Sequence, residues 1–181
     1  MSGSGSRYER SMPGMVGAMV VVIGVILVFV IVRAFNRDDF QVEREPIDYV
    51  PTVEGIQQAG SFPVVYPPSL PEEWKAVDLS YDPEALWSLS VFDGDERYVG
   101  LFQARSEVDD MVEEYVAEDA EEGAAVQLDS DLSGTWQTFS DGDGDHALVA
   151  RYRETVVMVV GAGDQQELRE FAESLSVEAV E

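Results

Sequence analysis

Carboxylates gather in one short segment of the chain at a spacing that could bind a cation. Asp141, Asp143 and Asp145 alternate with glycines, which is how a calcium-binding loop begins. The pattern then departs from that loop, because His146 stands where a glycine is needed and Tyr152 stands where a bidentate glutamate is needed. The three aspartates are the candidate metal ligands, and a Gly- and Asp-rich hairpin turn is the interpretation that we favour.

His146 is the only histidine of the chain and therefore its only imidazole for acid–base catalysis. A catalytic grouping with Ser140 and Asp145 would need Asp145 to orient the imidazole. Adjacent side chains on an extended strand point to opposite faces, which argues against that grouping. The sequence also lacks a nucleophile elbow, a phosphate-binding loop and a dinucleotide-binding glycine pattern. We therefore predict no catalytic residues, no cofactor and no enzymatic activity.

Three tryptophans offer a different kind of site. Trp74, Trp87 and Trp136 could line an apolar ligand pocket, since aromatic side chains are common in such pockets. Aromatic residues at strand spacing more often fill the core, and this is the interpretation that we favour. The chain has no cysteine, which excludes disulfides, thiolate metal sites and thiol nucleophiles.

Alternating apolar and polar residues predict the strands that would position these side chains. Trp87, Leu89 and Val91 alternate with serines, and a second apolar run follows at 98–102 after a turn at 93–95. This arrangement indicates a β-hairpin. Further strands are expected at 62–66, 135–139, 147–153 and 155–160.

Two helices are expected from apolar residues that recur every three or four positions. The first would follow the N-cap Ser106 and end at Gly123. Its apolar residues are Val108, Met111, Val112, Tyr115 and Val116. The second would follow Asp164, with Glu167 completing a capping box. Its apolar residues are Leu168, Phe171, Ala172 and Leu175. Since strands joined by tight turns pair antiparallel, we predict an α+β fold with a mainly antiparallel sheet and the helices packed on one face.

An uncharged apolar run occupies residues 15–32, MVGAMVVVIGVILVFVIV. At 1.5 Å per residue it is about 27 Å long, close to the ~30 Å hydrocarbon core of a bilayer. A buried helix of a soluble domain would show a polar face, and a cleavable signal peptide would end in small residues rather than in Arg33. We therefore predict an N-terminal transmembrane helix at 15–32 that acts as an uncleaved, single-pass signal anchor.

Charge is distributed unevenly on the two sides of the predicted anchor. The chain has a net charge of −25, and residues 1–35 carry three arginines and one glutamate, so residues 36–181 carry −27. Arginines flank both ends of the run, but the flank after it also contains acidic residues. We expect a cytoplasmic tail at 1–14, a membrane-proximal linker at 33–61 with two prolines, and an extracytoplasmic domain at 62–181. The acidic surface disfavours nucleic-acid partners and anionic lipids.

Short motifs spread over most of the chain match those of a known family. The matching residues are Arg7-Tyr8, Arg10-Ser11, Gly14 to Ala18, Tyr66-Pro67, Leu70-Pro71, Trp74, Trp87, Asp93-Gly94, Val99 to Leu101, Gln103, Tyr115-Val116, Trp136, Gly144-Asp145 and Ala147 to Val149. With these motifs the chain resembles the actinobacterial domain-of-unknown-function family 4245, whose members look like single-pass envelope proteins. The family pattern has a glycine where this chain has Glu73. The resemblance implies a bacterial envelope location and supplies no activity, substrate or site residue.

These observations lead to two functional hypotheses of different classes. The first is a non-enzymatic module of the cell envelope that binds a protein or a cell-wall component. The alternative is a small-ligand binding or sensing domain, which needs a concave pocket. An enzyme would need a cleft that unites His146 with a carboxylate and a hydroxyl.

Overall fold

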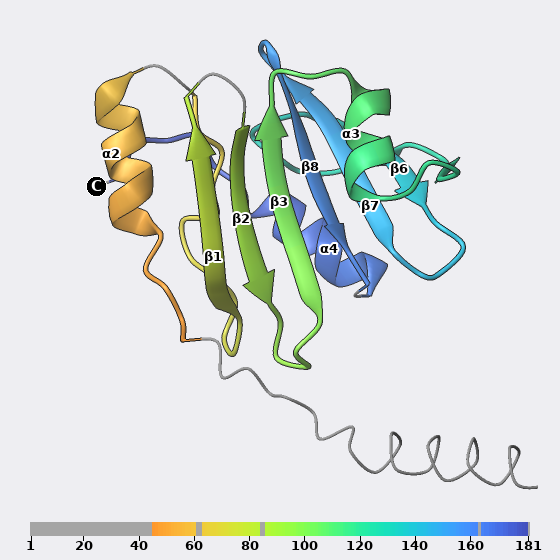
Figure 1. Cartoon of the computed structure of the whole chain (residues 1–181), viewed down its shortest axis with the longest axis horizontal. Helices are drawn as coiled ribbons and strands as arrows, with labels where there is room; N and C mark the ends of the chain where they lie inside the picture. The colour runs from red at the N-terminus through yellow and green to blue at the C-terminus, as the bar shows by residue number, and fades with distance from the viewer. Residues whose placement is uncertain (1–44, 61–62, 84–85, 163, 181) are drawn as a thin grey trace, which may run out of the picture. The chain divides into compact units, whose positions relative to one another are not determined.

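The computed structural model describes residues 45–60, 63–83, 86–162 and 164–180. Within these ranges the chain forms an antiparallel sheet of eight strands with three helices, which confirms the predicted α+β class (Figure 1). The predicted cytoplasmic tail and transmembrane helix, residues 1–14 and 15–32, lie outside the described residues. Among the helices that are described, none has the length and apolar character needed to cross a membrane.

The sheet has the spatial order β1-β2-β3-β8-β7-β6-β4, with β5 also paired with β6. The strands are β1 (Lys75–Asp82), β2 (Leu86–Phe92), β3 (Tyr98–Ala104), β4 (Glu121–Glu122), β5 (Val126–Gln127), β6 (Thr135–Ser140), β7 (His146–Tyr152) and β8 (Thr155–Gly161). The helices are α2 (Val50–Ala59), α3 (Val108–Tyr115) and α4 (Gln165–Glu173). The predicted strands at 135–139, 147–153 and 155–160 and the hairpin at 86–104 are confirmed.

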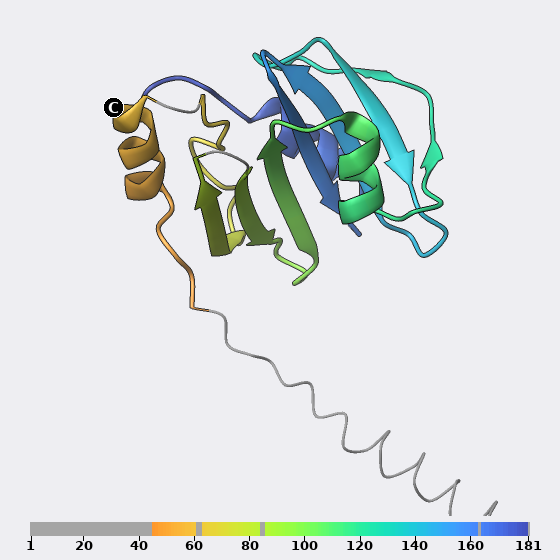
Figure 2. The ribbon, with the colours of Figure 1, turned by 45° about the horizontal axis from the view of Figure 1, so that its top comes forward.

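The helices cover both faces of the sheet, so the prediction that they pack on one face is wrong. Met158 of β8 lies in one apolar cluster with Met111 of α3, whereas Val159 lies in the other cluster with Phe171 of α4. Figure 1 and Figure 2 show α3 and α4 on opposite sides of the sheet. The physical reason is the sequence of β8, which is buried over its whole length and therefore needs a cover on each face.

The tryptophans fill the core, as the favoured interpretation predicts. Trp87 and Trp136 have no exposed surface, and Trp74 is half-buried and stacks on Phe171 with 5.4 Å between ring centroids. Glu73, just before Trp74, has φ of +72°, a left-handed conformation that suits glycine. The glycine of the family pattern at this position therefore has a conformational reason.

Helix α2 belongs to the folded domain, although the sequence assigned it to a linker at 33–61. Tyr49, Val53 and Ile56 are buried in the core, and the Tyr49 hydroxyl donates to the carbonyl oxygen of Pro67 at 2.7 Å. Burial of that hydroxyl raises the pKa of Tyr49 to about 12. The domain thus begins well before residue 62, because a ten-residue helix with one narrow apolar stripe packs against the sheet.

Three further elements differ from expectation. Residues 63–66 are extended but form only one bridge, between Tyr66 and Ser176, rather than a strand at 62–66. Strand β1 was not expected, although its apolar and polar residues alternate regularly over 77–82 and a bulge near Ala76 affects only the start of the strand. Helix α3 follows Glu107 instead of Ser106, and it ends at Tyr115 because the chain then turns to pair with β6 as β4, before the expected end at Gly123.

A buried amide fastens the segment at 63–66 to the sheet. Gln103 of β3 has no exposed surface, and its Oε1 accepts from the backbone N–H of Val65 at 2.8 Å. Its Nε2 donates to the carbonyl oxygen of Pro63 and to Oγ1 of Thr155. Both donors and the acceptor oxygen of the side chain are thus hydrogen-bonded inside the protein, which is the condition for burying an amide without a large penalty.

Replacing Gln103→Leu is expected to lower the free energy of unfolding by about 2–5 kcal/mol, because it leaves the partners of Gln103 unsatisfied in the core. Chemical denaturation followed by tryptophan fluorescence measures this loss. The matched control is Gln137→Leu on β6, an exposed position where we expect a change within about 0.5 kcal/mol. Equal losses for the two variants would contradict the role of Gln103.

Candidate functional site

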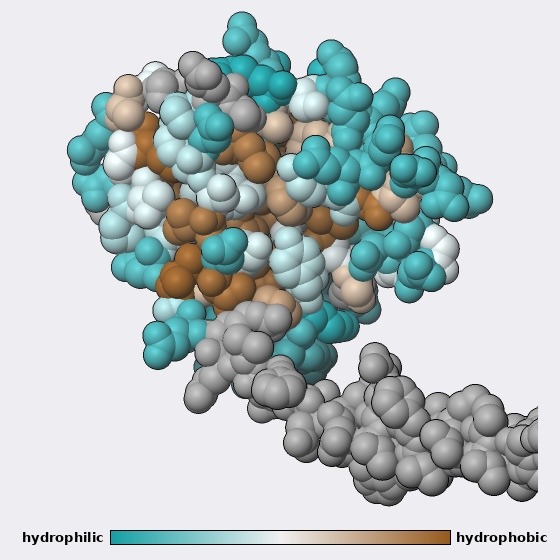
Figure 3. All heavy atoms as spheres, viewed as in Figure 1, coloured by the Kyte–Doolittle hydropathy of each residue, from teal (hydrophilic) through white to brown (hydrophobic). Residues whose placement is uncertain are grey.

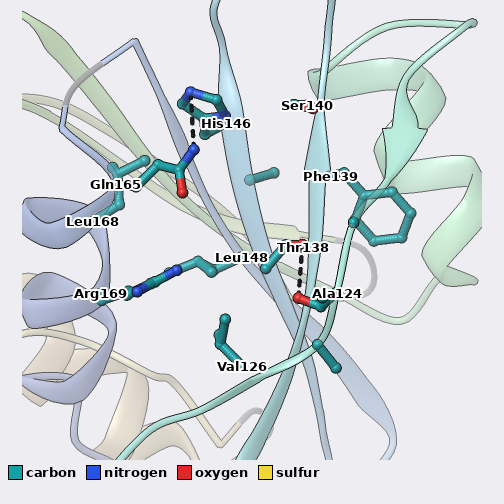
Figure 4. Close-up of a pocket in the computed structure, with 13 residues that line it drawn as sticks. Ala124, Val126, Thr138, Phe139, Ser140, His146, Leu148, Gln165, Leu168 and Arg169 are labelled. Atoms are coloured by element: carbon teal, nitrogen blue, oxygen red, sulfur yellow. Dashed lines mark hydrogen bonds between the residues drawn. The ribbon is translucent and has the colours of Figure 1, made fainter.

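A pocket of about 350 Å³ lies between α4, the β6–β7 hairpin and the segment that joins β4 to β5 (Figure 4). Its floor consists of Thr138 and Ser140 from β6 with His146 and Leu148 from β7. Ser140 pairs with His146 and Thr138 pairs with Leu148 in the antiparallel register, so the four side chains share one face of the sheet. The volume is at the lower end of the range of small-molecule sites.

One wall of the pocket is helix α4, which contributes Gln165, Leu168 and Arg169. Asp164 caps the helix as predicted, since its carboxylate accepts from the backbone N–H of Gln166 at 2.7 Å, whereas Glu167, expected to complete a capping box, bonds with Arg97. Leu168 is buried in the core and fixes the rotation of the helix. That rotation turns Gln165 and Arg169, four residues apart, toward the pocket (Figure 4).

An ion-pair network holds the first turn of α4 against the β2–β3 turn. The guanidinium of Arg97 donates to Asp93 at 2.7 Å and to Glu167 at 2.6 Å. Asp93 is itself buried and also accepts from the backbone N–H groups of Asp95 and Arg97. Because Glu167 lies between Gln165 and Arg169 in the sequence, this network positions the wall of the pocket.

The opposite wall is the short segment Gly123 to Val126. Its backbone is held to β6 by two hydrogen bonds, from Gly123 N–H to the Thr138 carbonyl oxygen at 2.8 Å and from Thr138 Oγ1 to the Ala124 carbonyl oxygen at 3.1 Å. A Cβ at Gly123 would lie 2.5 Å from Thr138 Oγ1, so the close approach needs glycine. The wall itself is small and apolar, and the polar groups of the pocket are on the other sides.

Arg169 is the one charged residue among those that line this pocket. Its Nε atom is buried, and the guanidinium forms no hydrogen bond or ion pair with any other residue that the structure describes. Figure 4 shows the side chain running from α4 toward Leu148 across the pocket. A buried donor without a partner costs about 1–3 kcal/mol, and more when it belongs to a charged group. The site therefore contains an unmet requirement for a hydrogen-bond acceptor.

Of the catalytic grouping Ser140, Asp145 and His146 that the sequence suggested, the structure brings two residues into the pocket. His146 and Ser140 are on its floor, whereas Asp145 is not among its lining residues. Nε2 of His146 lies 3.4 Å from the side-chain nitrogen of Gln165. The described lining includes no carboxylate, so the condition that would favour an enzyme, a histidine with both a carboxylate and a hydroxyl, is met only in part.

The aspartate-rich turn borders the pocket, since it connects Ser140 to His146. Oδ1 of Asp141 accepts from the backbone N–H groups of Asp143, Gly144 and Asp145 at 2.7 to 3.0 Å. These hydrogen bonds hold the pKa of the Asp141 carboxyl below its ordinary value of 3.8. Oδ1 of Asp141 thus closes the turn, whereas in a calcium-binding loop the corresponding oxygen would bind the ion. Within the described ranges, no three histidine, aspartate or glutamate side chains converge as a metal site would require.

A second pocket of about 340 Å³ adjoins the β7–β8 turn and the end of α2, and its lining includes Gln57, Tyr152 and Arg153. The cation in this pocket is already engaged, because the Arg153 guanidinium lies 5.2 Å from the centre of the Tyr152 ring. The pocket beside α4 differs from it in holding an arginine without a partner. We therefore take the pocket beside α4 as the candidate site.

The fold and the pocket define an α+β domain with an antiparallel sheet, helices on both faces and a small polar pocket beside its C-terminal helix. A family described as "Protein of unknown function (DUF4245)" matches residues 7–175, and the chain belongs to this family. No curated protein and no solved structure matches the chain.

Sequence reasoning placed His146 and Ser140 among the candidates but overlooked Gln165 and Arg169. The helix was predicted from the apolar residues of one face, and Gln165 and Arg169 flank that face. A usable signal was present, because Arg169 is the only basic residue in a helix with three glutamates.

The pKa of Asp141 gives the turn beside the pocket a pH dependence. A carboxyl whose pKa is lower in the folded protein adds stability at neutral pH, and that stability is lost as the pH falls through the folded pKa. We therefore expect Asp141→Asn to be less stable than the native protein at pH 7, with the difference shrinking below pH 3.8. Urea denaturation between pH 7 and pH 3 measures the difference. The control Asp143→Asn removes the same charge from an exposed position, and a pH-independent loss for Asp141→Asn would rule out the charge effect.

Proposed function

We propose that this protein is a membrane-anchored binding module of the cell envelope, with its acidic domain outside the cytoplasm and without enzymatic activity. The anchor is the uncharged run at 15–32, which is long enough to span the hydrocarbon core. The short tail with Arg7 and Arg10 before the run, and the acidic residues among the arginines after it, support the same orientation. The resemblance of the motifs to those of envelope proteins adds to this support.

The pocket beside α4 is the binding site in this proposal, and it is the observation that carries the binding function. Its walls come from elements far apart in the sequence, 123–126, 138–148 and 165–169, which three sets of hydrogen bonds and ion pairs hold in place. A pocket with fixed walls loses little conformational entropy when it binds. Its volume suits a small ligand or a single chemical group of a larger partner.

The absence of catalysis is proposed from the way the pocket's polar groups are arranged. His146 faces Gln165, a neutral amide that cannot orient and charge an imidazole as a carboxylate does. In the turn that precedes His146, the carboxylate of Asp141 is already hydrogen-bonded to backbone N–H groups. The pocket therefore offers donors and acceptors for recognition and no activated nucleophile.

A second candidate function, docking of a protein or a cell-wall component, is favoured by a different surface. Apolar residues lie among polar ones over β1 and β2 on the face seen in Figure 3. Phe92 and Tyr98 contact each other edge to face at 5.9 Å, and Tyr98 is 38% exposed. Exposed aromatic side chains of this kind occur at the centres of protein interfaces.

The orientation can be tested by single-cysteine labelling, because the chain contains no cysteine of its own. We expect a membrane-impermeant maleimide to label Glu118→Cys, an exposed position, on intact cells. The control Ser4→Cys in the predicted cytoplasmic tail should react only after lysis. Labelling of Ser4→Cys alone on intact cells would reverse the proposed orientation.

The two candidate functions are separated by photo-crosslinking in intact cells. A photoreactive phenylalanine is placed at Ala125 in the pocket, at Tyr98 on the sheet, or at the exposed control position Glu118. We expect a specific adduct at Ala125, identified by intact mass. An adduct at Tyr98 alone would favour macromolecular docking on the sheet, and adducts no more abundant than those at Glu118 would count against both functions.

A further inference from the structure

We propose that the pocket beside α4 recognises a singly charged anionic group, a carboxylate, through the guanidinium of Arg169. This inference rests on the proposed binding function, since it names the chemistry of what the pocket holds. It starts from Arg169, a cationic side chain without a carboxylate partner among the described residues, in a protein with many more acidic than basic residues.

Two other arginines of the described domain form ion pairs with its carboxylates. Arg97 bonds with Asp93, Asp95 and Glu167, and Arg151 bonds with Glu107. The chain has 36 acidic residues against 11 basic ones, so an exposed arginine has carboxylates within easy reach. Arg169 forms no ion pair with the described residues because its side chain leaves the polar side of α4 and enters the pocket (Figure 4). The fold thus keeps the Arg169 guanidinium away from the protein's own carboxylates.

The geometry of a guanidinium explains why a carboxylate suits this position. The Nε–H and one terminal N–H of arginine form a planar pair of donors that matches the two oxygens of a carboxylate. In Arg169 the Nε atom of that pair lies beneath the surface without an acceptor. A turn of the guanidinium about its terminal torsions presents both donors to a bound anion, and little is lost because the buried donor had no partner before.

Neutral polar groups complete the site around the cation. Gln165 and His146 present two nitrogen atoms, 3.4 Å apart, to the same pocket, and Ser140 adds a hydroxyl to the floor. Because the described lining contains no carboxylate, a bound anion meets no like charge inside the pocket. One oxygen atom of a ligand accepts from Gln165 while its carboxylate pairs with Arg169.

The charge of the whole domain restricts the anion to a single charge. Residues 36–181 carry −27, so a polyanion is repelled more strongly than a monoanion as it approaches. One arginine neutralises one negative charge. A carboxylate therefore fits the site better than an inorganic phosphate or a nucleotide, and a free acid or a peptide C-terminus brings this group.

The test uses the full chain in lipid nanodiscs and two probes that differ only in charge, N-acetylglycine and its amide, with inorganic phosphate as a third. NMR follows the side-chain Nε–H signal of Arg169 and the backbone amides of residues 124–126 and 165–169. We expect N-acetylglycine to shift these signals in a saturable manner and to bind about tenfold or more tightly than the amide, the usual difference for a charge-assisted hydrogen bond. Phosphate should bind more weakly than N-acetylglycine.

Variants then assign the preference to Arg169. We expect Arg169→Gln to lower the affinity for N-acetylglycine to that for the amide, and Arg169→Lys to retain part of it because the charge stays while the planar fork is lost. The control Arg153→Gln, which removes the same charge from the other pocket, should bind as the native protein does.

Three outcomes would overturn the inference. They are equal binding of N-acetylglycine and its amide, an unchanged affinity in Arg169→Gln, and no shift of the pocket signals by N-acetylglycine at millimolar concentration. If both probes bind equally in the pocket, the carboxylate preference is wrong but the proposed binding function stands. The binding function itself fails only if the crosslinking experiment shows that the pocket holds nothing in cells. The two failures are therefore distinguishable.

Discussion

The pairing of β3 with β8 is the contact on which the rest of the domain depends. It joins the hairpin of the first half of the chain to the hairpins of the second half, from Val99 beside Gly161 to Ala104 beside Val156. The approach is close, because a Cβ at Gly161 would lie 2.4 Å from the carbonyl oxygen of Tyr98. Since β8 is buried along both faces, the pairing is stable only when α3 and α4 cover it from opposite sides.

The pocket is a consequence of this central arrangement. Helix α4 contacts β7 and β8 but not the whole width of the sheet, and the outer strands β4 and β5 are short. The backbone of 123–126 closes the open side by bonding to Thr138, and the space that remains is the pocket. Its position is therefore set by the lengths of β4 and β5, and its chemistry by the residues of α4 that flank the buried Leu168.

Local features could be predicted from the sequence, and features that depend on distant contacts could not. The hairpins around residues 93–95 and 141–145 and the cap of α4 at Asp164 are encoded within a few residues and were found. The end of α3 depends on the pairing of β4 with β6, so its local signal was incomplete, whereas the alternation that marks β1 is present at 77–82 and was not recognised. Helix α2 was assigned to a linker, because nothing near it reveals that Gln57 bonds with the C-terminal segment.

The same division holds for the site. His146 and Ser140 stood out as residue types, and their shared face followed once the turn between them was identified as a hairpin. Arg169 is defined by what surrounds it, and only the three-dimensional structure reveals that its Nε atom lacks an acceptor. The Glu73 position shows the reverse case, in which the family pattern of a glycine anticipated a left-handed backbone.

The way α2 is fastened has a mechanical consequence. The first described residues bond to the domain through Ile47 N–H and the Ala76 carbonyl oxygen, and Tyr49 and Gln57 then tie α2 to Pro67 and to the C-terminal residues Glu178 and Val180. Tension that entered the domain from residue 45 would load these contacts, which reach only the edge strand β1 of the sheet, before it reached the strands that line the pocket. The contacts of α2 would therefore break first, and the pocket, which shares no residue with them, would keep its shape under that tension.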